Sequence, residues 1–254
     1  MIFLRSTLFN IFFFLTTAIA CVLFLPGLFI PRKHAMHIVQ IFVQTVYLLE
    51  RAFLKLDYEV RGLENLPEQG CYIVAAKHQS SYETFKLHIL FPDPSVILKK
   101  ELLRIPLWGK FLAKSDPIAI DRSSKDSAQQ IIDGAKRMKD QGRPIIIFPQ
   151  GTRVYSWQTA VDRPYKSGAA RMQDATGLTI VPMATNTGIF WPKHSWLKWP
   201  GTVVFEFLPP IAPGHGVSDT TKQIEILLET ESKKLELEAL SANPKIPRPE
   251  RPSA

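Results

Sequence analysis

The sequence predicts an α/β domain with a mostly parallel sheet flanked by helices, preceded by an N-terminal membrane-associated helical hairpin. Three observations support this prediction. An uncharged apolar run opens the chain, several short apolar runs follow it, and helical patterns lie between those runs. Continuous apolar strands are typical of a sheet covered on both faces, and alternating strands and helices are typical of a parallel sheet.

The N-terminal apolar run extends from Ser6 to Pro31 and contains no charged residue. Roughly 20 apolar residues suffice to cross a bilayer core, so the run is long enough. A second stretch, Met36–Leu49, is shorter and amphipathic, and Pro26 and Pro31 mark the turn between the two. We therefore expect residues 1–55 to form a membrane-anchoring hairpin, whose first segment either spans the bilayer or re-enters it.

Two other interpretations of this run compete with an anchor. Ala18-Ile19-Ala20 before Cys21 resembles a lipoprotein signal-peptide cleavage site, but apolar sequence continues for ten residues beyond it. A buried core helix is disfavoured because the segment is apolar on every side. The positive residues at 32–34 favour a cytoplasmic position for the domain that follows, on the inner membrane if the source is bacterial.

Seven apolar runs are predicted as the strands of the sheet. They cover residues 58–62, 71–76, 95–98, 117–120, 144–149, 178–184 and 202–208. The clearest helical pattern runs from Asp126 to Gln141, and a last helix is expected over residues 220–240. These elements define a domain over residues 56–242. The tail at 243–254 is rich in proline and is predicted to be disordered.

Charge and cysteine content narrow the class of partner. The chain has 254 residues and a net charge of +8, which suits nucleic acid, anionic lipid headgroups or phosphorylated substrates. The apolar N-terminus favours lipid, and no aromatic platform accompanies the basic residues, so nucleic acid is not expected. Cys21 and Cys71 have neither CxxC spacing nor clustered histidines, so the sequence predicts no metal site and no disulfide framework.

The stretch KHQSSYETF, residues 77–85, combines two patterns. His78 follows an apolar strand, and Glu83 lies five positions later, at the start of a predicted helix. Residues five apart lie about 140° apart on a helix, so the two side chains meet only if His78 stays at the strand end. Ser80 and Glu83 also have the S-x-x-E spacing of a capping box. Spacing alone supports a helix cap and a catalytic pair equally.

Basic residues follow other predicted strands. Arg153 of the motif FPQGTR follows one predicted strand, and Arg122 of the motif IDR follows another. Lys99 of the motif LKKEL follows a third. Ligands bind at the carboxyl ends of strands in α/β sheets, and an arginine fork suits a phosphate or a carboxylate. Each motif alone is weak evidence, because a basic side chain after a strand is more commonly a solvated surface residue. Together with the histidine they indicate a base beside an anion cradle.

Taken in order, these motifs resemble those of a known family. H-x4-E, K-x-E-L, I-D-R, F-P-x-G-T-R, P-x-K-x-G and V-P are similar to the motifs of the glycerolipid acyltransferase superfamily, most of all its 1-acylglycerol-3-phosphate O-acyltransferase branch. The resemblance covers roughly residues 58–213, and the hairpin also resembles that family's membrane anchor. It implies an enzyme that moves an acyl chain from a thioester to the free sn-2 hydroxyl of 1-acylglycerol-3-phosphate (lysophosphatidic acid), giving phosphatidic acid.

The resemblance also implies roles for individual residues. His78 corresponds to the general base and Glu83 to the acid that orients it. The acyl donor is acyl-CoA or acyl-carrier protein, which are co-substrates, so no bound cofactor is expected. The acceptor is a membrane lipid. The phosphate-binding residues implied by the family motifs are Arg153, Gly151, Thr152, Lys99 and Arg122, and the acyl-donor or pocket-wall residues are Val181 and Pro182.

Two residues depart from the family pattern. Glu83 stands where the acid is usually aspartate, so one extra methylene must be accommodated. Gln150 replaces the glutamate of FPEGTR, which keeps the shape of the side chain and removes a charge. Two alternatives stay open: an acyltransferase of the same superfamily that acts on another lysophospholipid or lipid acceptor, and a non-catalytic lipid-binding membrane protein.

Overall fold

The computed structural model describes residues 1–251 and is built around a seven-stranded sheet of order β1-β7-β6-β2-β5-β3-β4. All neighbouring strands are parallel except β6 and β7, which are antiparallel. The strands are β1 (Leu56–Arg61), β2 (Ile73–Ala76), β3 (Ser95–Lys99), β4 (Ile118–Ile120), β5 (Ile145–Ile147), β6 (Ile180–Thr185) and β7 (Gly201–Phe207). The predicted strands and the mostly parallel sheet are confirmed.

The four strands that precede the sequence motifs are consecutive in the sheet. β2, β5, β3 and β4 lie side by side, and each neighbouring pair is parallel. The register pairs Ile145 of β5 with Ile73 on one side and with Ser95 on the other. Parallel strands end at the same edge, so the residues that follow these four strands must gather at one place.

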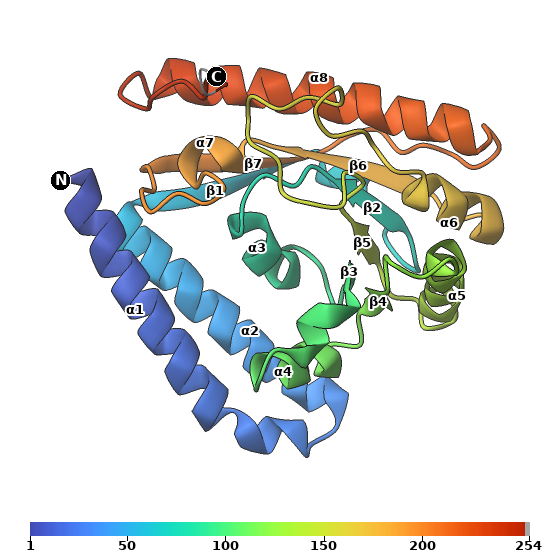
Figure 1. Ribbon diagram of the computed structural model, residues 1–254, viewed down its shortest axis with the longest axis horizontal. Helices are drawn as coiled ribbons and strands as arrows, with labels where there is room; N and C mark the ends of the chain where they lie inside the picture. Colours follow the sequence, from blue (N-terminus) through green and yellow to red (C-terminus); the bar gives the residue numbers. More distant parts are fainter. Residues whose placement is uncertain (252–254) are drawn as a thin grey trace.

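Helices cover both faces of the sheet, with α8 on one side and α1, α2 and α3 on the other (Figure 1). Ile73 of β2 packs in a cluster with residues of α5, α6 and α8, whereas its neighbour Val74 packs with residues of α3. This burial on both faces explains the continuous apolar strands. The helices of the domain are α3 (Tyr82–Leu90), α4 (Trp108–Lys114), α5 (Ser127–Asp140), α6 (Gly168–Thr176), α7 (Thr187–Phe190) and α8 (Val217–Ala242).

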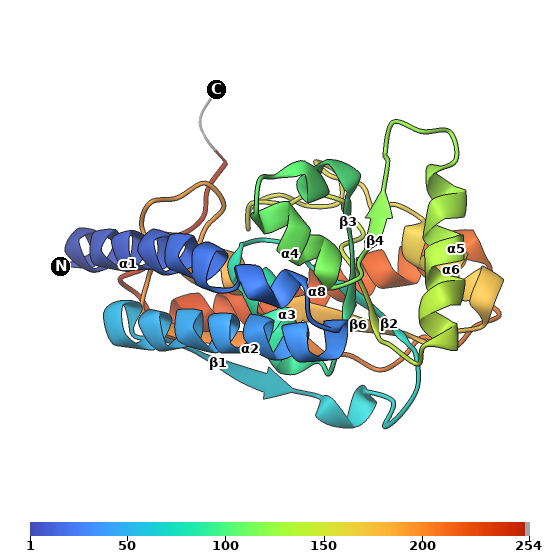
Figure 2. The same ribbon diagram turned by 90° about the horizontal axis from the view of Figure 1, so that it is seen from below.

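The N-terminal segment forms a helical hairpin of α1 (Ile2–Leu23) and α2 (Arg32–Leu49), which lie side by side (Figure 2). Pro26 opens the short 3-10 turn between them, and Pro31 is the N-cap of α2. Among the described residues, α1 is the one helix long and apolar enough to cross a membrane. Its apolar surface suggests membrane association.

One side of α1 is fixed to the domain by polar contacts. The Ser6 hydroxyl accepts the Lys198 backbone N–H at 2.9 Å, and Asn10 Oδ1 accepts from Lys198 Nζ at 2.8 Å. Phe9 is fully buried between them and meets Trp191 edge to face at 5.2 Å. Burial lowers the pKa of Lys198 to about 8. The helix therefore has one face built to contact protein and one that is apolar and exposed.

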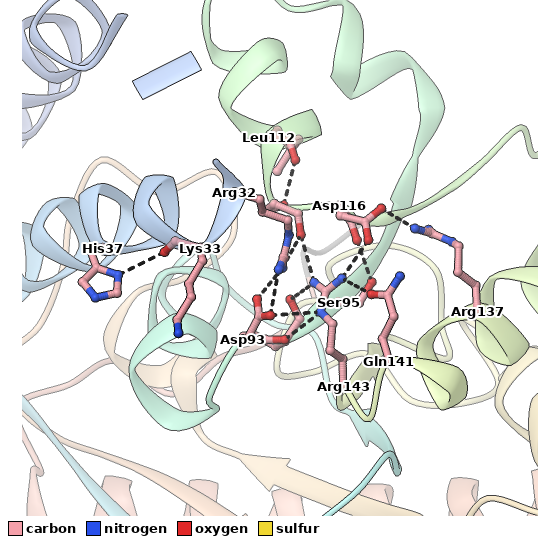
Figure 3. Close-up of polar contacts among 12 residues, drawn as sticks. Arg32, Lys33, His37, Asp93, Ser95, Leu112, Asp116, Arg137, Gln141 and Arg143 are labelled. Carbon is pink, nitrogen blue, oxygen red and sulfur yellow. Dashed lines mark hydrogen bonds and ion pairs between the residues drawn. The ribbon is translucent and has the colours of Figure 1, made fainter. Parts of the chain in front are cut away.

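An ion-pair network holds the start of α2 (Figure 3). Arg32 donates to both carboxylate oxygens of Asp93, with a distance of 2.8 Å from Nη1 to Oδ2. Arg143 lies 3.3 Å from the same carboxylate and 2.8 Å from Asp116. Burial alone would raise the pKa of Asp116, but Arg137 and Arg143 hold it below its usual range. The network joins the hairpin to the loops that precede β3 and β4.

A second ion pair joins the hairpin to α3. Lys86 of α3 pairs with Glu50, which follows α2, and both side chains are fully buried. The Lys86 ammonium also lies 4.4 Å from the ring centroid of Tyr47 and 4.5 Å from that of Tyr82. Burial raises the pKa of Glu50 to about 7, although the nearby Lys86 ammonium acts to lower it. Because Glu83 lies one turn earlier on α3, this pair connects the hairpin to the helix of the sequence motif.

The C-terminal tail differs from the predicted disorder over residues 243–251. Ile246 is buried in the core, and Arg251 pairs with Asp162 and lies 5.3 Å from the ring centroid of Trp157. The Pro-rich composition of the segment does not reveal these contacts, because they involve residues far away in the sequence. The last three positions of the predicted tail, 252–254, lie outside the described residues.

Replacing Lys86 by methionine should lower the free energy of unfolding by about 3–5 kcal/mol, because the buried Glu50 loses its counter-charge. The double variant K86M/E50Q should recover part of this loss. Chemical denaturation of the protein in detergent, followed by tryptophan fluorescence, measures both. The matched control K222M removes an exposed lysine from an exposed pair with Glu225 and should change stability by less than about 1 kcal/mol. Equal effects of K86M and K222M would contradict the assignment.

Candidate active site

The histidine at the end of β2 and the glutamate in the first turn of α3 meet. His78 Nδ1 lies 2.8 Å from Glu83 Oε1. The same oxygen accepts the backbone N–H groups of Gln79 at 2.7 Å and Ser80 at 2.8 Å. The Glu83 side chain is fully buried. The imidazole and two backbone N–H groups therefore share one carboxylate oxygen of Glu83.

This contact determines the tautomer of His78. A carboxylate accepts hydrogen bonds and cannot donate them, so Nδ1 of the neutral ring carries the hydrogen. Nε2 is then the acceptor nitrogen of the imidazole. The ring stacks on Phe148, with centroids 4.0 Å apart and planes 21° apart. The His78 carbonyl accepts the Val154 N–H at 2.7 Å, so both the ring and the backbone are fixed.

The helix cap and the paired side chains coexist. α3 begins at Tyr82, with Ser81 as its N-cap. Ser80 Oγ accepts the Tyr82 N–H at 3.1 Å, while the Ser80 N–H donates to Glu83. Glu83 thus ties down the start of the helix and contacts His78 with the same oxygen. The extra methylene of glutamate is accommodated in this arrangement.

Helix α8 holds the residues on either side of His78. Gln79 Nε2 donates to Glu236 Oε1 at 2.6 Å, and buried Lys77 pairs with Glu229. The two glutamates are seven positions apart, which is about two helical turns, so they lie on the same side of α8. Local sequence reasoning missed these contacts because α8 is distant in the sequence.

The FPQGTR turn that follows β5 adopts a conformation suited to glycine. Gly151 has a φ of +70°, and its N–H donates to the Phe148 carbonyl at 2.8 Å. The Arg122 guanidinium donates to the Gly151 carbonyl. Arg153 Nη1 donates to Ser81 Oγ at 2.6 Å, which ties the arginine to the start of α3. The turn, the IDR motif and the histidine motif are therefore in direct contact.

A cavity of about 710 Å³ lies against these residues. Its polar end is bordered by His78, Lys99, Arg122, Gly151, Thr152, Arg153 and Lys166. The structure thus brings together the predicted base and all five predicted phosphate-binding residues. Lys166 adds a further cation. It belongs to the P-x-K-x-G motif at a predicted helix start, and in the structure it lies beside Gly151.

The rest of the cavity wall is largely apolar, and the hairpin supplies part of it. Phe24 and Phe42 come from the hairpin, and Phe85 and Trp108 come from α3 and α4. His88 is another wall residue, and burial lowers its pKa to about 4, so it is neutral at pH 7. The sequence predicted the hairpin as an anchor and did not show that it forms part of the site.

Gln150 lies beside this cavity without bordering it in the part of the chain that the structure describes. Its side chain is buried, and Nε2 donates to the Arg163 carbonyl at 3.3 Å. An amide can make this bond, whereas a carboxylate cannot. The replacement of glutamate by glutamine therefore suits a structural contact and does not change the charge of the cavity wall.

The structure places Val181 and Pro182 in the core, in contrast to the expected pocket wall. Both are buried in β6, where Val181 pairs with Val74 and Pro182 pairs with Ala75 of β2. Within residues 1–251, neither borders the cavity beside His78. The V-P motif lies in the interior of β6, as it does in the predicted strand 178–184, and its pairing with β2 keeps both residues within the sheet.

The candidate site combines a histidine, a group of cations and a largely apolar wall. A neutral imidazole with a free Nε2 can accept a proton from a hydroxyl group. The four cations can bind a phosphate, and the apolar wall can receive a hydrocarbon chain. Among residues 1–251, no group of three histidine, cysteine or acidic side chains could hold a metal ion.

Comparisons with known proteins agree with this geometry. Residues 57–186 match the family model described as Acyltransferase. A 1-acyl-sn-glycerol-3-phosphate acyltransferase of Pseudomonas aeruginosa is 38% identical over 187 residues, which are 73% of this chain and 71% of that protein. A protein of the same name from Saccharomyces cerevisiae is 32% identical over 177 residues, which are 68% of this chain and 57% of that protein.

The fold is also similar to a solved structure. The crystal structure of the 1-acyl-sn-glycerophosphate (LPA) acyltransferase PlsC from Thermotoga maritima superposes with a TM-score of 0.74. The match covers 93% of this chain and 98% of that one at 22% identity, so it concerns the fold. The family model and the relative from Pseudomonas aeruginosa show that the chain belongs to the acyltransferase family.

Proposed function

We propose that this protein transfers an acyl chain from an acyl thioester to the sn-2 hydroxyl of 1-acylglycerol-3-phosphate, giving phosphatidic acid. The observation that carries the proposal is one cavity that combines the His78–Glu83 pair, a cluster of cations and an apolar wall. Lysophosphatidic acid presents a hydroxyl, a phosphate and a hydrocarbon chain, which are the complementary groups. The names of the two curated relatives support the same acceptor.

The reaction follows from the tautomer of His78. The acceptor hydroxyl attacks the thioester carbonyl while His78 Nε2 takes its proton. Glu83 then stabilises the imidazolium through Nδ1. When the tetrahedral intermediate collapses, the C–S bond breaks and the imidazolium returns the proton to the departing thiolate. The new ester C–O bond forms directly, so no acyl-enzyme is needed.

The acceptor phosphate is assigned to the cationic end of the cavity. Arg153 is the main ligand in this proposal, because its guanidinium can bind two phosphate oxygens and its contact with Ser81 fixes its position. Lys99, Arg122 and Lys166 border the same space and add positive charge. These groups together suit a dianionic headgroup.

In this proposal the site binds an acceptor from the membrane and an acyl donor from the aqueous phase. The exposed apolar face of α1 anchors the protein, and the basic residues 32–34 favour the cytoplasmic side. Acyl-CoA and acyl-carrier protein both deliver a thioester from the aqueous phase. The acyl chain would lie along the apolar wall that the hairpin and α4 form.

Purified full-length protein should release one thiol for each molecule of phosphatidic acid formed from lysophosphatidic acid. A thiol reagent and mass spectrometry measure the two products with acyl-CoA and with acyl-carrier protein as donor. Monoacylglycerol, which lacks the phosphate, should react roughly tenfold more slowly or worse, because charge-assisted hydrogen bonds contribute about 1.5–3 kcal/mol each. The proposal fails if neither donor yields thiol, and its acceptor assignment fails if monoacylglycerol reacts equally well.

Replacing His78 by alanine should lower kcat by about 10²–10⁴ while the protein stays folded, because the general base is lost. Glu83→Gln should also lower kcat, since the imidazolium loses its carboxylate partner. His194→Ala is the matched control, because His194 is exposed and does not border the cavity in the described chain. Steady-state kinetics measure kcat for each variant, and circular dichroism checks that each variant is folded. Retention of most activity by H78A would remove His78 from this role.

Replacing Arg153 by lysine should raise the KM for lysophosphatidic acid roughly tenfold with a smaller effect on kcat, because the charge stays while the planar fork is lost. Arg153→Ala should raise it further. Arg61→Ala is the matched control on strand β1, where the side chain pairs with Glu59 and Glu238 on the surface. If R153K changes the KM for the acyl donor and not for the acceptor, the phosphate assignment is wrong.

A further inference from the structure

We propose that a second surface beside the hairpin contacts an anionic bilayer. This surface is the segment of residues 99–110, which includes the 3-10 helix Lys100–Arg104 and the start of α4; we call it the basic segment. The proposal rests on the association of the hairpin with a membrane and does not depend on the reaction.

The basic segment displays several partly exposed apolar side chains. Leu102 is 40% exposed, Ile105 is 43% exposed and Leu107 is 39% exposed. Pro106 between them is exposed as well. Scattered apolar residues are normal on a protein surface, but a contiguous group of them marks an interaction site. The group forms part of one short loop and therefore acts as a unit.

The backbone of the segment presents Leu107 in an unusual conformation. Leu107 has a φ of +59° and a ψ of −61°, a region that residues with a side chain rarely adopt. The turn is tight, because a Cβ at Gly109 would lie 2.3 Å from the Leu103 carbonyl oxygen. The chain itself accounts for this conformation, because the Trp108 N–H donates to the Pro106 carbonyl at 2.7 Å and closes a tight turn around Leu107. The turn leaves the Leu107 side chain 39% exposed.

The charge of the segment is positive. Lys99, Lys100, Arg104 and Lys110 are exposed, and Glu101 is the one acidic residue among residues 99–110. None of the four cations forms an ion pair within residues 1–251. Apolar side chains interspersed with lysine and arginine are typical of surfaces that lie in the headgroup region of anionic membranes.

The basic segment is continuous with the hairpin. Lys114 Nζ donates to the Leu28 carbonyl in the hairpin turn at 3.2 Å, and the ring centroid of Trp108 lies 5.8 Å from that of Phe42 in α2. Phe29 at the same turn is 89% exposed. Figures 1 and 2 both show α4 beside the turn that joins α1 and α2. A membrane that covers the hairpin tip is therefore within reach of the segment.

The basic segment lies beside the cavity as well as beside the hairpin. Leu102 and Trp108 border the cavity that holds His78. A bilayer in contact with the basic segment would bring lipids directly to that cavity wall. An acidic carrier protein could use the same cations, but the exposed apolar side chains and the continuity with α1 favour the bilayer.

Site-specific fluorescence tests the proposal. In full-length protein with Cys21→Ser and Cys71→Ser, an environment-sensitive dye is attached to Ile105→Cys, and the protein is added to vesicles of phosphatidylcholine with or without phosphatidylglycerol. We expect a blue-shifted emission, quenching by spin-labelled lipids and protection from aqueous iodide, most strongly with phosphatidylglycerol. Val161→Cys is the aqueous control, because Val161 is 92% exposed, and Val22→Cys on α1 is the hairpin control, with Val22 60% exposed.

Each outcome decides the matter. If the dye at 22 is quenched by lipid while the dye at 105 behaves like that at 161, the hairpin associates and the second contact is wrong. If the dye at 105 is shielded by acyl-carrier protein and not by vesicles, the segment is a protein docking site and the proposal is overturned. The variant K100Q/R104Q should reduce the preference for anionic over neutral vesicles by at least roughly tenfold, and an unchanged preference would contradict the charge argument.

Discussion

The carboxylate of Glu83 is the interaction on which the site depends. One oxygen accepts hydrogen bonds from His78 Nδ1 and from the backbone N–H groups of Gln79 and Ser80. These three hydrogen bonds hold the bend between β2 and α3. A fully buried carboxylate needs such donors in place of water. The same bend sets the tautomer of the histidine and presents Ser81 to the arginine of the neighbouring turn. One side chain thus contributes both to the local fold of this bend and to the orientation of the histidine.

The hairpin is a structural part of the candidate site as well as an apolar segment. The buried Lys86–Glu50 pair joins it to α3, and the pair of Arg32 with Asp93 joins it to the loop before β3. Phe24 and Phe42 complete the apolar wall of the cavity. The helix whose apolar surface suggests membrane association therefore belongs to the same hairpin that completes the cavity wall.

Much of this organisation could be predicted because it follows from short-range patterns. Apolar runs located the strands, and the rule that parallel strands end at one edge predicted that His78 and Arg153 would converge. The contacts that support the histidine could not be predicted, because they come from distant segments: Phe148 stacks on its ring, and Glu236 of α8 holds Gln79. The resemblance assigned Pro182 to a pocket wall, whereas its pairing with Ala75 of β2 places it inside the sheet.

The central claim is that Glu83 holds His78 as the tautomer with the hydrogen on Nδ1. Nitrogen-15 NMR of histidine-labelled protein in detergent measures this directly, with the signals of residue 78 assigned by their absence in His78→Gln. The account predicts a protonated Nδ1 and an unprotonated Nε2 in the neutral ring, and loss of this preference in Glu83→Ala. A neutral ring with its hydrogen on Nε2 would contradict the account, because that nitrogen could not then accept the proton of a hydroxyl group.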